Sequence, residues 1–336
     1  MRLWSRRRQK VKTITLALQG GGAHGAYTWG VLDRLLEEPR LIIEGISATS
    51  AGAMNAAVLA QGVMTGGPEG ARATLESFWR HVSEAAQATP FQSTWLGRWL
   101  RSFASTMMAP MFSPYQFNPL NLNPLRDLLI KTIDFESLRE SSTVKLFISA
   151  TNVRNGKIKV FETRDVSADV LMASACLPFL YRAVEIDGEP YWDGGYMGNP
   201  AIFPLIYDCE SRDVVIVRIT PIRRDEVPKT TGEILSRINE LTFNSSLMRE
   251  VRAIAFVTRL IDERVVKRRR LKRILIHDID AEPYMVRLAH SSKLNVDWSF
   301  LVHLRDVGRE SAERWIKANF DKLGIESSID LRADFL

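Results

Sequence analysis

The sequence has few cysteines and no long apolar run, and each shortage excludes a class of protein. Cys176 and Cys209 are the only cysteines among 336 residues, which excludes a disulfide-rich secreted scaffold. Neither they nor the five histidines show the spacing of metal ligands, so we expect no metal and no cofactor. No uninterrupted apolar run approaches the roughly 20 residues that cross a bilayer. The basic residues 1–12 could imitate a signal peptide, but the apolar stretch after them is short and ends in glycines; we therefore expect a cytoplasmic protein.

Positive charge is concentrated in two segments of the chain. The net charge is +6, and residues 1–12 and 264–273 are rich in Lys and Arg and contain no acid. Such segments suit an anionic membrane surface, and they are equally typical of solvent-exposed tails and helix faces. The two expectations are therefore a peripheral contact with the inner face of the membrane or a solvated surface. We expect no nucleic acid, and the oligomeric state stays open.

Apolar β-rich segments alternate with helical patterns, which favours an α/β protein with a central, largely parallel sheet. The expected strands cover residues 13–18, 41–48, 144–153, 213–220 and 274–280. Asn155-Gly156 and Asp187-Gly188 each predict a hairpin turn. Helices are expected directly after Gly25 and Ser50, and over residues 68–87, 122–132, 231–270 and 299–320. Hydrophobic residues make up 46% of the chain, enough for one large domain or for one domain with an extension.

A glycine-rich loop follows the first expected strand. Residues Gly20, Gly21, Gly22 and Gly25 satisfy the pattern G-x-G-x-x-G, which can hold the phosphates of a dinucleotide. Glu44, at the next expected strand, then takes the place of the acid that binds a ribose. A nucleotide-binding oxidoreductase is therefore one interpretation of this loop. The other is an oxyanion hole, because glycines let backbone N–H groups turn toward a reacting oxygen.

A second loop favours the oxyanion hole. Ala48-Thr49-Ser50-Ala51-Gly52 stands between an apolar strand and an alanine-rich helix, and is a near match to the nucleophile elbow G-x-S-x-G. Small residues flank such a serine because the turn is tight and the strand and helix nearly touch. In this interpretation the oxyanion hole consists of the N–H groups of Gly21, Gly22 and Ala51, and Ser50 is the nucleophile. The alternative is an ordinary turn with a helix-capping serine.

A serine nucleophile needs a base, and the sequence offers two kinds. Asp193 follows an expected hairpin strand and precedes Gly194 and Gly195, so its carboxylate can approach another loop closely. Alone, the same pattern is typical of a turn aspartate. His277-Asp278 suggests a Ser-His-Asp triad instead, although His277 does not stand among small loop residues.

Together these motifs resemble the patatin-like phospholipase family, in which a G-G-G-x-x-G loop, a G-x-S-x-G elbow and a D-G-[GA] motif follow in that order. Residues 150–161 and 173–195 are also similar to the middle and closing segments of that family. Ala48 departs from the first elbow glycine, and His24 stands where the family often has Arg or Lys. The resemblance implies a Ser50-Asp193 catalytic dyad without histidine, no cofactor, and a lipid or other acyl-ester substrate.

The resemblance also implies a fold and a domain organisation. We expect a three-layer α/β domain over residues 14–205 whose largely parallel sheet is flanked by helices. Residues 206–336 are expected to form a mainly helical extension, which can belong to the same globule. Three functions besides a lipid acyl hydrolase stay open: an acyltransferase with the same dyad, the nucleotide-binding oxidoreductase, and a catalytically silent lipid-binding protein.

One amphipathic segment offers a place for an acyl chain. Trp95, Trp99, Phe103 and Met107 recur at helical spacing within residues 93–112. The functional interpretation is a lid or a membrane-docking helix, and the alternative is a helix of the core.

Overall fold

We analysed a computed structural model of the chain, which describes residues 10–87, 114–117, 123–178, 180–265, 271–288 and 290–335. The amphipathic segment around Trp95 and Trp99 therefore lies outside the described residues, as do most of the first basic segment and the middle of the second. Within the described ranges, no helix combines the length and the apolar character needed to cross a bilayer.

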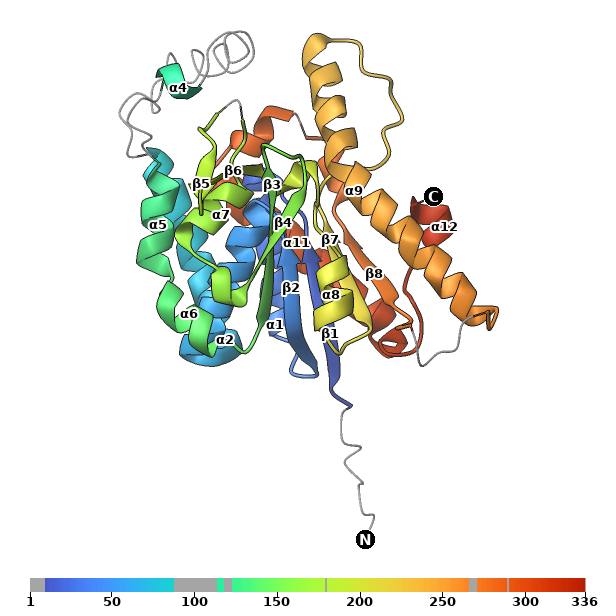
Figure 1. Ribbon diagram of the computed structural model, residues 1–336. Helices are drawn as coiled ribbons and strands as arrows, with labels where there is room; N and C mark the ends of the chain where they lie inside the picture. Colours follow the sequence, from blue (N-terminus) through green and yellow to red (C-terminus); the bar gives the residue numbers. More distant parts are fainter. Residues whose placement is uncertain are drawn as a thin grey trace.

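The centre of the molecule is an eight-stranded sheet (Figure 1). Five strands are parallel to their neighbours, in the spatial order β3 (Lys145–Asn152), β2 (Leu41–Ala48), β1 (Lys12–Leu18), β7 (Asp213–Arg218) and β8 (Leu275–Asp280). Three shorter strands complete the sheet around β3: β4 (Ile158–Glu162) and β6 (Glu189–Asp193) pair with β3, and β5 (Val184–Ile186) pairs with β6. This confirms the predicted α/β architecture with a largely parallel sheet.

Helices cover both faces of the sheet because side chains alternate along each strand. On β1, Ile14, Leu16 and Leu18 enter one core, and Ala17 enters the other. The first core includes residues of α1 (Gly25–Leu36), α2 (Ala51–Gln87), α5 (Pro124–Thr132), α6 (Phe135–Ser141), α7 (Ala168–Ser174), α10 (Glu282–Met285) and α11 (Trp298–Asn319). The second includes residues of α8 (Phe203–Asp208), α9 (Thr231–Asp262) and α12 (Leu331–Phe335). Figure 1 shows α8 and α9 in front of the sheet and α1 behind it.

The predicted helix starts are correct, and one predicted end is wrong. Thr230 and Glu233 form a reciprocal capping box that starts α9. This helix ends at Asp262 and not near residue 270, because Arg264 takes a left-handed φ of 59°. The chain of α2 leaves helical geometry at Gly66 and Gly67 and becomes helical again from Pro68. A helical turn, α4 (Pro114–Phe117), lies between undescribed segments of the chain, and Arg182 donates a hydrogen bond to its Tyr115 carbonyl (3.0 Å).

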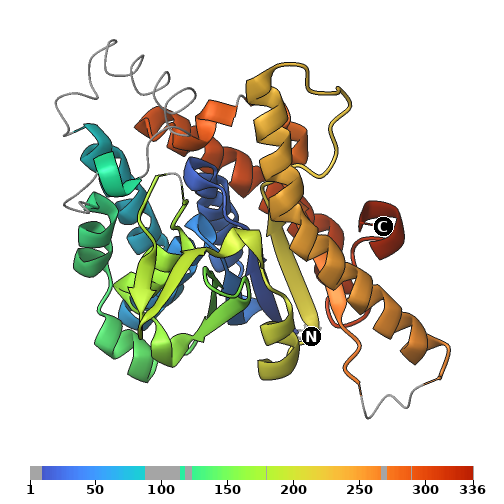
Figure 2. The same ribbon diagram turned by 45° about the horizontal axis from the view of Figure 1, so that its top comes forward.

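Strands of the C-terminal extension continue the same sheet. β7 pairs with β1, and β8 pairs with β7, although both follow residue 206. The long helix α9 crosses the face of the molecule beside them (Figure 2). The division between residues 205 and 206 stays a prediction.

The register of β3 explains how two distant parts of the sequence meet. β4 pairs with residues 147–151 of β3, and this fixes one edge of the strand. On the other edge, β2 reaches Ile148 with Ala48, and β6 begins its pairing at Ala150 with Asp193. Asp193 therefore lies directly beyond the carboxyl end of β2, where Ser50 follows Ala48.

Candidate active site

Ser50 stands on a strained turn between a strand and a helix. β2 ends at Ala48, α2 begins at Ala51, and Ser50 has a left-handed φ of 55°. Such a φ is uncommon for a residue with a Cβ, and it is typical of a nucleophile elbow. The N–H of Ser50 donates to Ser174 Oγ (2.9 Å), and the Thr49 hydroxyl donates to the Gly198 carbonyl (2.6 Å). These side-chain bonds hold the turn from both sides.

The departure from the family pattern at Ala48 has a simple geometric reason. Ala48 is the last residue of β2 and is absent from the residues with positive φ, so its backbone needs no glycine. The left-handed conformation falls on Ser50 instead. At the other end of the motif, a Cβ on Gly52 would lie 2.6 Å from the Leu18 carbonyl oxygen, so a side chain is excluded there.

The glycine loop lies against the serine. A Cβ on Gly20 would be 2.6 Å from Ser50 Cβ, and a Cβ on Gly25 would be 2.8 Å from Ala51 Cβ. The Gly20 N–H donates to Asn199 Oδ1 (2.7 Å). The N–H groups of Gly21 and Gly22 donate no hydrogen bond to any of the described residues. Two backbone donors beside Ser50 are therefore free for a ligand, at the start of α1.

Asp193 is buried next to Ser50. It is the last residue of β6, is 1% exposed, and accepts a hydrogen bond from the Gly195 N–H (2.7 Å). Burial raises the pKa of the Asp193 carboxyl to about 7, against the opposing effect of hydrogen bonds from the Gly195 N–H and the Ser50 side chain. Gly194 has to be small, because a Cβ there would lie 2.2 Å from the Ser149 carbonyl oxygen.

Neither His277 nor His24 completes a triad with Ser50. His277 lies on β8, three strands from β2, and its Nε2 is 3.0 Å from Asp213 Oδ1. His24 is in the glycine loop, but its side chain is buried and its Nε2 is 2.7 Å from Ser292 Oγ. Of the candidate bases, the structure brings Asp193 to Ser50 and leaves His277 away from it.

Glu44 is not placed for a ribose. It lies within β2, before the carboxyl end where the glycine loop and Ser50 meet. Its carboxylate accepts hydrogen bonds from Lys145 Nζ (3.1 Å) and from the N–H groups of Glu210 (2.7 Å) and Ser211 (2.8 Å). Open α/β sheets bind ligands beyond the carboxyl ends of the strands, so the dinucleotide interpretation lacks its acidic residue.

Sequence reasoning missed the polar residues that support the two loops. Ser174 and Asn199 bond the backbone of Ser50 and Gly20, and Gln19 bonds both Asn199 and Asn244. They carry no motif, and their partners are far away in the sequence. The one signal in the sequence that could have found any of them is the position of Asn199 shortly after the Asp193 motif.

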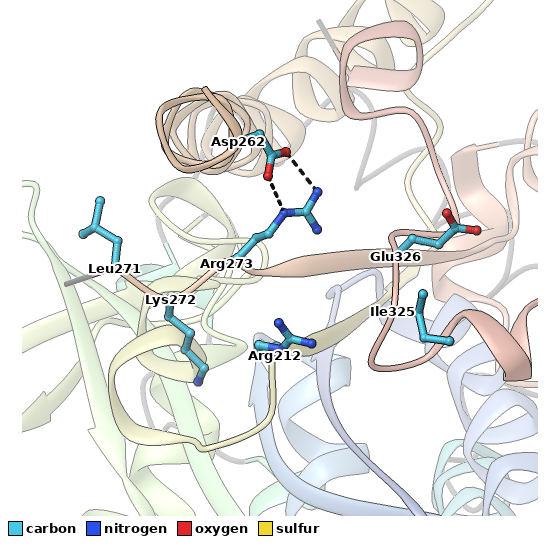
Figure 3. Close-up of a pocket in the computed structure, with 7 residues that line it drawn as sticks. All are labelled: Arg212, Asp262, Leu271, Lys272, Arg273, Ile325 and Glu326. Atoms are coloured by element: carbon cyan, nitrogen blue, oxygen red, sulfur yellow. Dashed lines mark hydrogen bonds and ion pairs between the residues drawn. The ribbon is translucent and has the colours of Figure 1, made fainter. Parts of the chain in front are cut away.

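A separate polar hollow lies at the opposite, amino edge of the sheet (Figure 3). It has a volume of about 660 Å³ and is lined by Arg212 before β7, by Leu271, Lys272 and Arg273 before β8, and by Asp262, Ile325 and Glu326. Arg273 pairs with Asp262 through two hydrogen bonds (2.9 and 3.0 Å), so Asp262 compensates part of the positive charge that lines the hollow. Across the part of the chain that the structure describes, no group of three or more Cys, His, Asp or Glu side chains could hold a metal ion.

Comparison with known families agrees with the site. The model of the family described as "Patatin-like phospholipase" matches residues 16–206, which is more than half of the chain and contains Ser50, Asp193 and the glycine loop. The chain belongs to the patatin-like phospholipase family. The search of curated proteins found no match.

Two solved structures that are similar to this chain have low sequence identity to it. VipD from Legionella pneumophila is 16% identical, with 88% of this chain and 67% of that chain covered and a TM-score of 0.37. ExoU, in the heterodimeric ExoU-SpcU complex from the type III secretion system of Pseudomonas aeruginosa, is 15% identical, with 94% and 52% covered and a TM-score of 0.41. The present chain thus spans about half to two thirds of these longer proteins.

Proposed function

We propose that the chain is a serine acyl hydrolase that cleaves acyl esters of lipids, with Ser50 as nucleophile and Asp193 as general base. One observation carries the proposal: the Ser50 side chain is hydrogen-bonded to a buried carboxyl whose pKa is raised to about 7. A base with a pKa near the working pH is the most effective one. Membership of a family of lipid hydrolases supports the same class of reaction.

The reaction follows from these positions. Asp193 takes the hydroxyl proton as Ser50 Oγ attacks the acyl carbon, and the carbonyl electron pair moves onto its oxygen. That oxyanion accepts hydrogen bonds from the N–H groups of Gly21, Gly22 and Ala51. When the intermediate collapses, the alcohol leaves with the proton from Asp193 and an acyl-enzyme remains. Water then attacks the acyl-enzyme, gives a proton to Asp193, and releases the fatty acid as the proton returns to Ser50.

The direct test is covalent labelling. A fluorophosphonate should attach to Ser50, and mass spectrometry of the digested protein locates the label. Turnover of a phospholipid with water alone should release fatty acid, whereas an acyltransferase would yield an acylated alcohol when an alcohol is added. Label on another residue would move the nucleophile, and no label on a folded protein would favour a catalytically silent lipid-binding protein.

A substitution in the glycine loop tests the oxyanion hole. Gly22 has a left-handed φ of 61°, and a Cβ there would lie 2.5 Å from the Lys293 carbonyl oxygen. We expect Gly22→Ala to displace an N–H donor and to lower kcat about 100-fold, as loss of such a donor does elsewhere. The measurement is steady-state hydrolysis of a soluble short-chain ester.

The control for that substitution keeps the backbone strain and removes the contact. Gly156 has a similar φ of 69°, and nothing lies within 4 Å of a Cβ built on it. Gly156→Ala should therefore cost some stability and leave kcat unchanged. Equal kcat for the two variants would mean that Gly22 takes no part in an oxyanion hole. Saturable binding of NAD by calorimetry would favour the dinucleotide interpretation.

The family domain and its extension form one working unit in this proposal. Residues 14–205 supply the glycine loop, Ser50 and Asp193, and residues 206–336 supply β7, β8 and α9.

We further propose peripheral contact with a lipid surface at the carboxyl edge of the sheet, because Ser50 lies there. The described ends of the two basic segments, at Lys12 and Lys272, lie at the amino edge, away from Ser50.

Helix α9 offers an apolar surface at the carboxyl edge. Ile234, Leu235, Ile238 and Leu241 recur at helical spacing on its first half and are 42–54% exposed. The same half packs on the turn that follows Asp193, since Phe243 contacts Tyr196 with ring centroids 5.3 Å apart. Insertion of this stripe into a bilayer would bring the site to its substrate.

We expect Ile238→Ser with Leu241→Ser to weaken binding to vesicles about tenfold, because two large apolar side chains lose their burial in lipid. The loss should persist at high salt, which screens charges but not apolar contacts. Replacing Lys267, Arg268, Arg269 and Arg270 by Gln should leave this binding unchanged, because the described end of that segment, at Lys272, lies at the opposite edge of the sheet. Vesicle sedimentation at two salt concentrations tests both expectations.

Phe256 provides the matched control on the same helix. It is 53% exposed, close to the 52% of Ile238 and the 54% of Leu241, but it lies about 27 Å along the axis from Ile238, toward the amino edge. Phe256→Ser should leave vesicle binding unchanged. Equal losses for both helix positions, or none for either, would contradict docking through the first half of α9.

A further inference from the structure

We propose that Asn244 of α9 is a positioning residue that fixes the glycine loop through a buried chain of side-chain amides. This inference rests on the proposed role of that loop as the oxyanion hole. It assigns the C-terminal extension a part in the site that the family motifs, all before residue 206, do not contain.

Gln19 is the centre of the chain of amides. It precedes the glycine loop and is fully buried. Its Oε1 accepts hydrogen bonds from the N–H groups of Ile219 and Thr220, both at 2.9 Å, just after β7. Its Nε2 donates to the Asn199 carbonyl (3.2 Å) and to Asn244 Oδ1 (3.1 Å). The Gln19 side chain thus makes four hydrogen bonds, and Asn244 supplies the one from α9.

Asn199 carries the restraint to the loop itself. Its Oδ1 accepts the Gly20 N–H at 2.7 Å, and its own N–H donates to Ser246 Oγ of α9 at 3.1 Å. Asn199 is fully buried, so neither bond competes with bulk water. Helix α9 therefore holds the residue before the first glycine, Gln19, through Asn244, and the hydrogen-bond partner of that glycine, Asn199, through Ser246.

Asn244 is itself held in a single orientation. Its Nδ2 donates to the Pro221 carbonyl (2.9 Å) while its Oδ1 accepts from Gln19, so the amide cannot flip without losing both bonds. The neighbouring Phe243 packs against the other loop of the site, where a Cβ on Gly195 would lie 2.2 Å from its ring. One turn of α9 thus supports the glycine loop and the turn after Asp193.

The glycine loop needs such support because its own residues provide none. Glycines have no side chains to pack, and they lose more conformational freedom on ordering than other residues. An oxyanion hole works only if its N–H groups point at the oxyanion before the reaction starts. The bond from the Gly20 N–H fixes the Gln19–Gly20 peptide plane, from which the chain enters the loop that carries the N–H groups of Gly21 and Gly22.

The test compares two asparagines of one helix. Asn244→Leu keeps the approximate volume and removes the amide, whereas the control Asn239→Leu changes an exposed asparagine of α9. We expect Asn244→Leu to lower kcat for a soluble ester 10- to 100-fold through misplaced donors, with KM unchanged. Hydrogen–deuterium exchange in the peptide around residues 16–26 should become faster. Asn239→Leu should change neither quantity.

A second variant keeps the inference testable if Asn244→Leu does not fold. Ser246→Ala removes one hydroxyl, the acceptor of the Asn199 N–H, and should produce the same change to a smaller degree. Unchanged kcat and unchanged exchange around residues 16–26 in the folded variants would overturn the inference. So would faster exchange throughout the protein, which indicates general destabilisation.

The exchange measurement separates this inference from the proposed function. If the unaltered protein hydrolyses no ester, the proposed function fails, and exchange around residues 16–26 alone decides whether Asn244 positions the loop. If the protein hydrolyses esters through Ser50 but Asn244→Leu leaves kcat and exchange unchanged, the proposed function stands and this inference is wrong.

Discussion

Ser50→Ala should abolish ester hydrolysis and fluorophosphonate labelling while the protein remains folded. The substitution removes the nucleophilic oxygen and keeps the Cβ, so the cost of the left-handed φ of 55° is the same in both proteins. The bonds that hold the elbow use backbone atoms of residue 50 and the side chains of Ser174 and Thr49, and these remain. Hydrolysis of a soluble ester and circular dichroism measure the two expectations.

A second serine serves as the control for Ser50. Ser141 is exposed at the end of α6, and Ser141→Ala should retain full activity and labelling. Ser174→Ala should have an intermediate effect, because it loosens the turn that presents Ser50 without removing the nucleophile. Labelling that persists in folded Ser50→Ala would place the nucleophile elsewhere.

The turns whose backbone geometry the sequence predicted are those whose signal is local. The glycine loop and the elbow each fit within a few residues between a strand and a helix, and their small side chains are required by contacts such as that of Gly20 with Ser50. The helix starts were predictable for the same reason, since a capping box such as that of Thr230 involves neighbours in the sequence.

The meeting of Ser50 and Asp193 depends on strand register, which the sequence does not express. It requires that β2 and β6 share one edge of β3, and that β4 occupies the other. For the same reason the sequence could not predict the roles of Asn199 and Asn244, because their hydrogen-bond partners lie far away in the chain. It also made Glu44 resemble a ribose-binding acid, although it bonds the loop before β7.

The second large effect concerns the base. Asp193→Asn preserves the size of the side chain and an oxygen acceptor for the Gly195 N–H, but it removes the proton acceptor. A general base typically contributes about 10²–10⁴-fold to the rate, so kcat should fall at least about 100-fold. If His277→Ala were equally damaging and Asp193→Asn mild, a histidine would be the base.

The pH dependence of the unaltered protein follows from the same group. The base works when it is ionised, and burial raises the pKa of Asp193 to about 7. We therefore expect kcat/KM for a soluble ester to rise with pH, to reach half its maximum near pH 7, and to level off above it. A profile that is flat from pH 5 to pH 9 would contradict Asp193 as base.

The raised pKa of Asp193 also predicts that Asp193→Asn, although inactive, has a larger free energy of unfolding than the unaltered protein at alkaline pH. Between its ordinary value of 3.8 and about 7, folded Asp193 keeps a proton that the unfolded chain has released, so the free energy of unfolding falls as pH rises through this interval. Above pH 7 the cost reaches its full size, on the order of 4 kcal/mol. Asp193→Asn should remove this cost, so the variant should be more stable than the unaltered protein at pH 8. The difference should shrink to almost nothing near pH 4.

Glu250 allows the two effects of a buried carboxyl to be separated. Burial also raises its pKa to about 7, against hydrogen bonds from the Ile202 and Phe203 N–H groups, and it lies on α9 without contact to Ser50. Glu250→Gln should therefore show the same gain in stability at pH 8 by urea unfolding and retain hydrolysis. Asp193→Asn should show the gain together with the loss of kcat. If Asp193→Asn is less stable than the unaltered protein at pH 8, its carboxyl is ionised at no cost, and the raised pKa on which the proposed base depends is wrong.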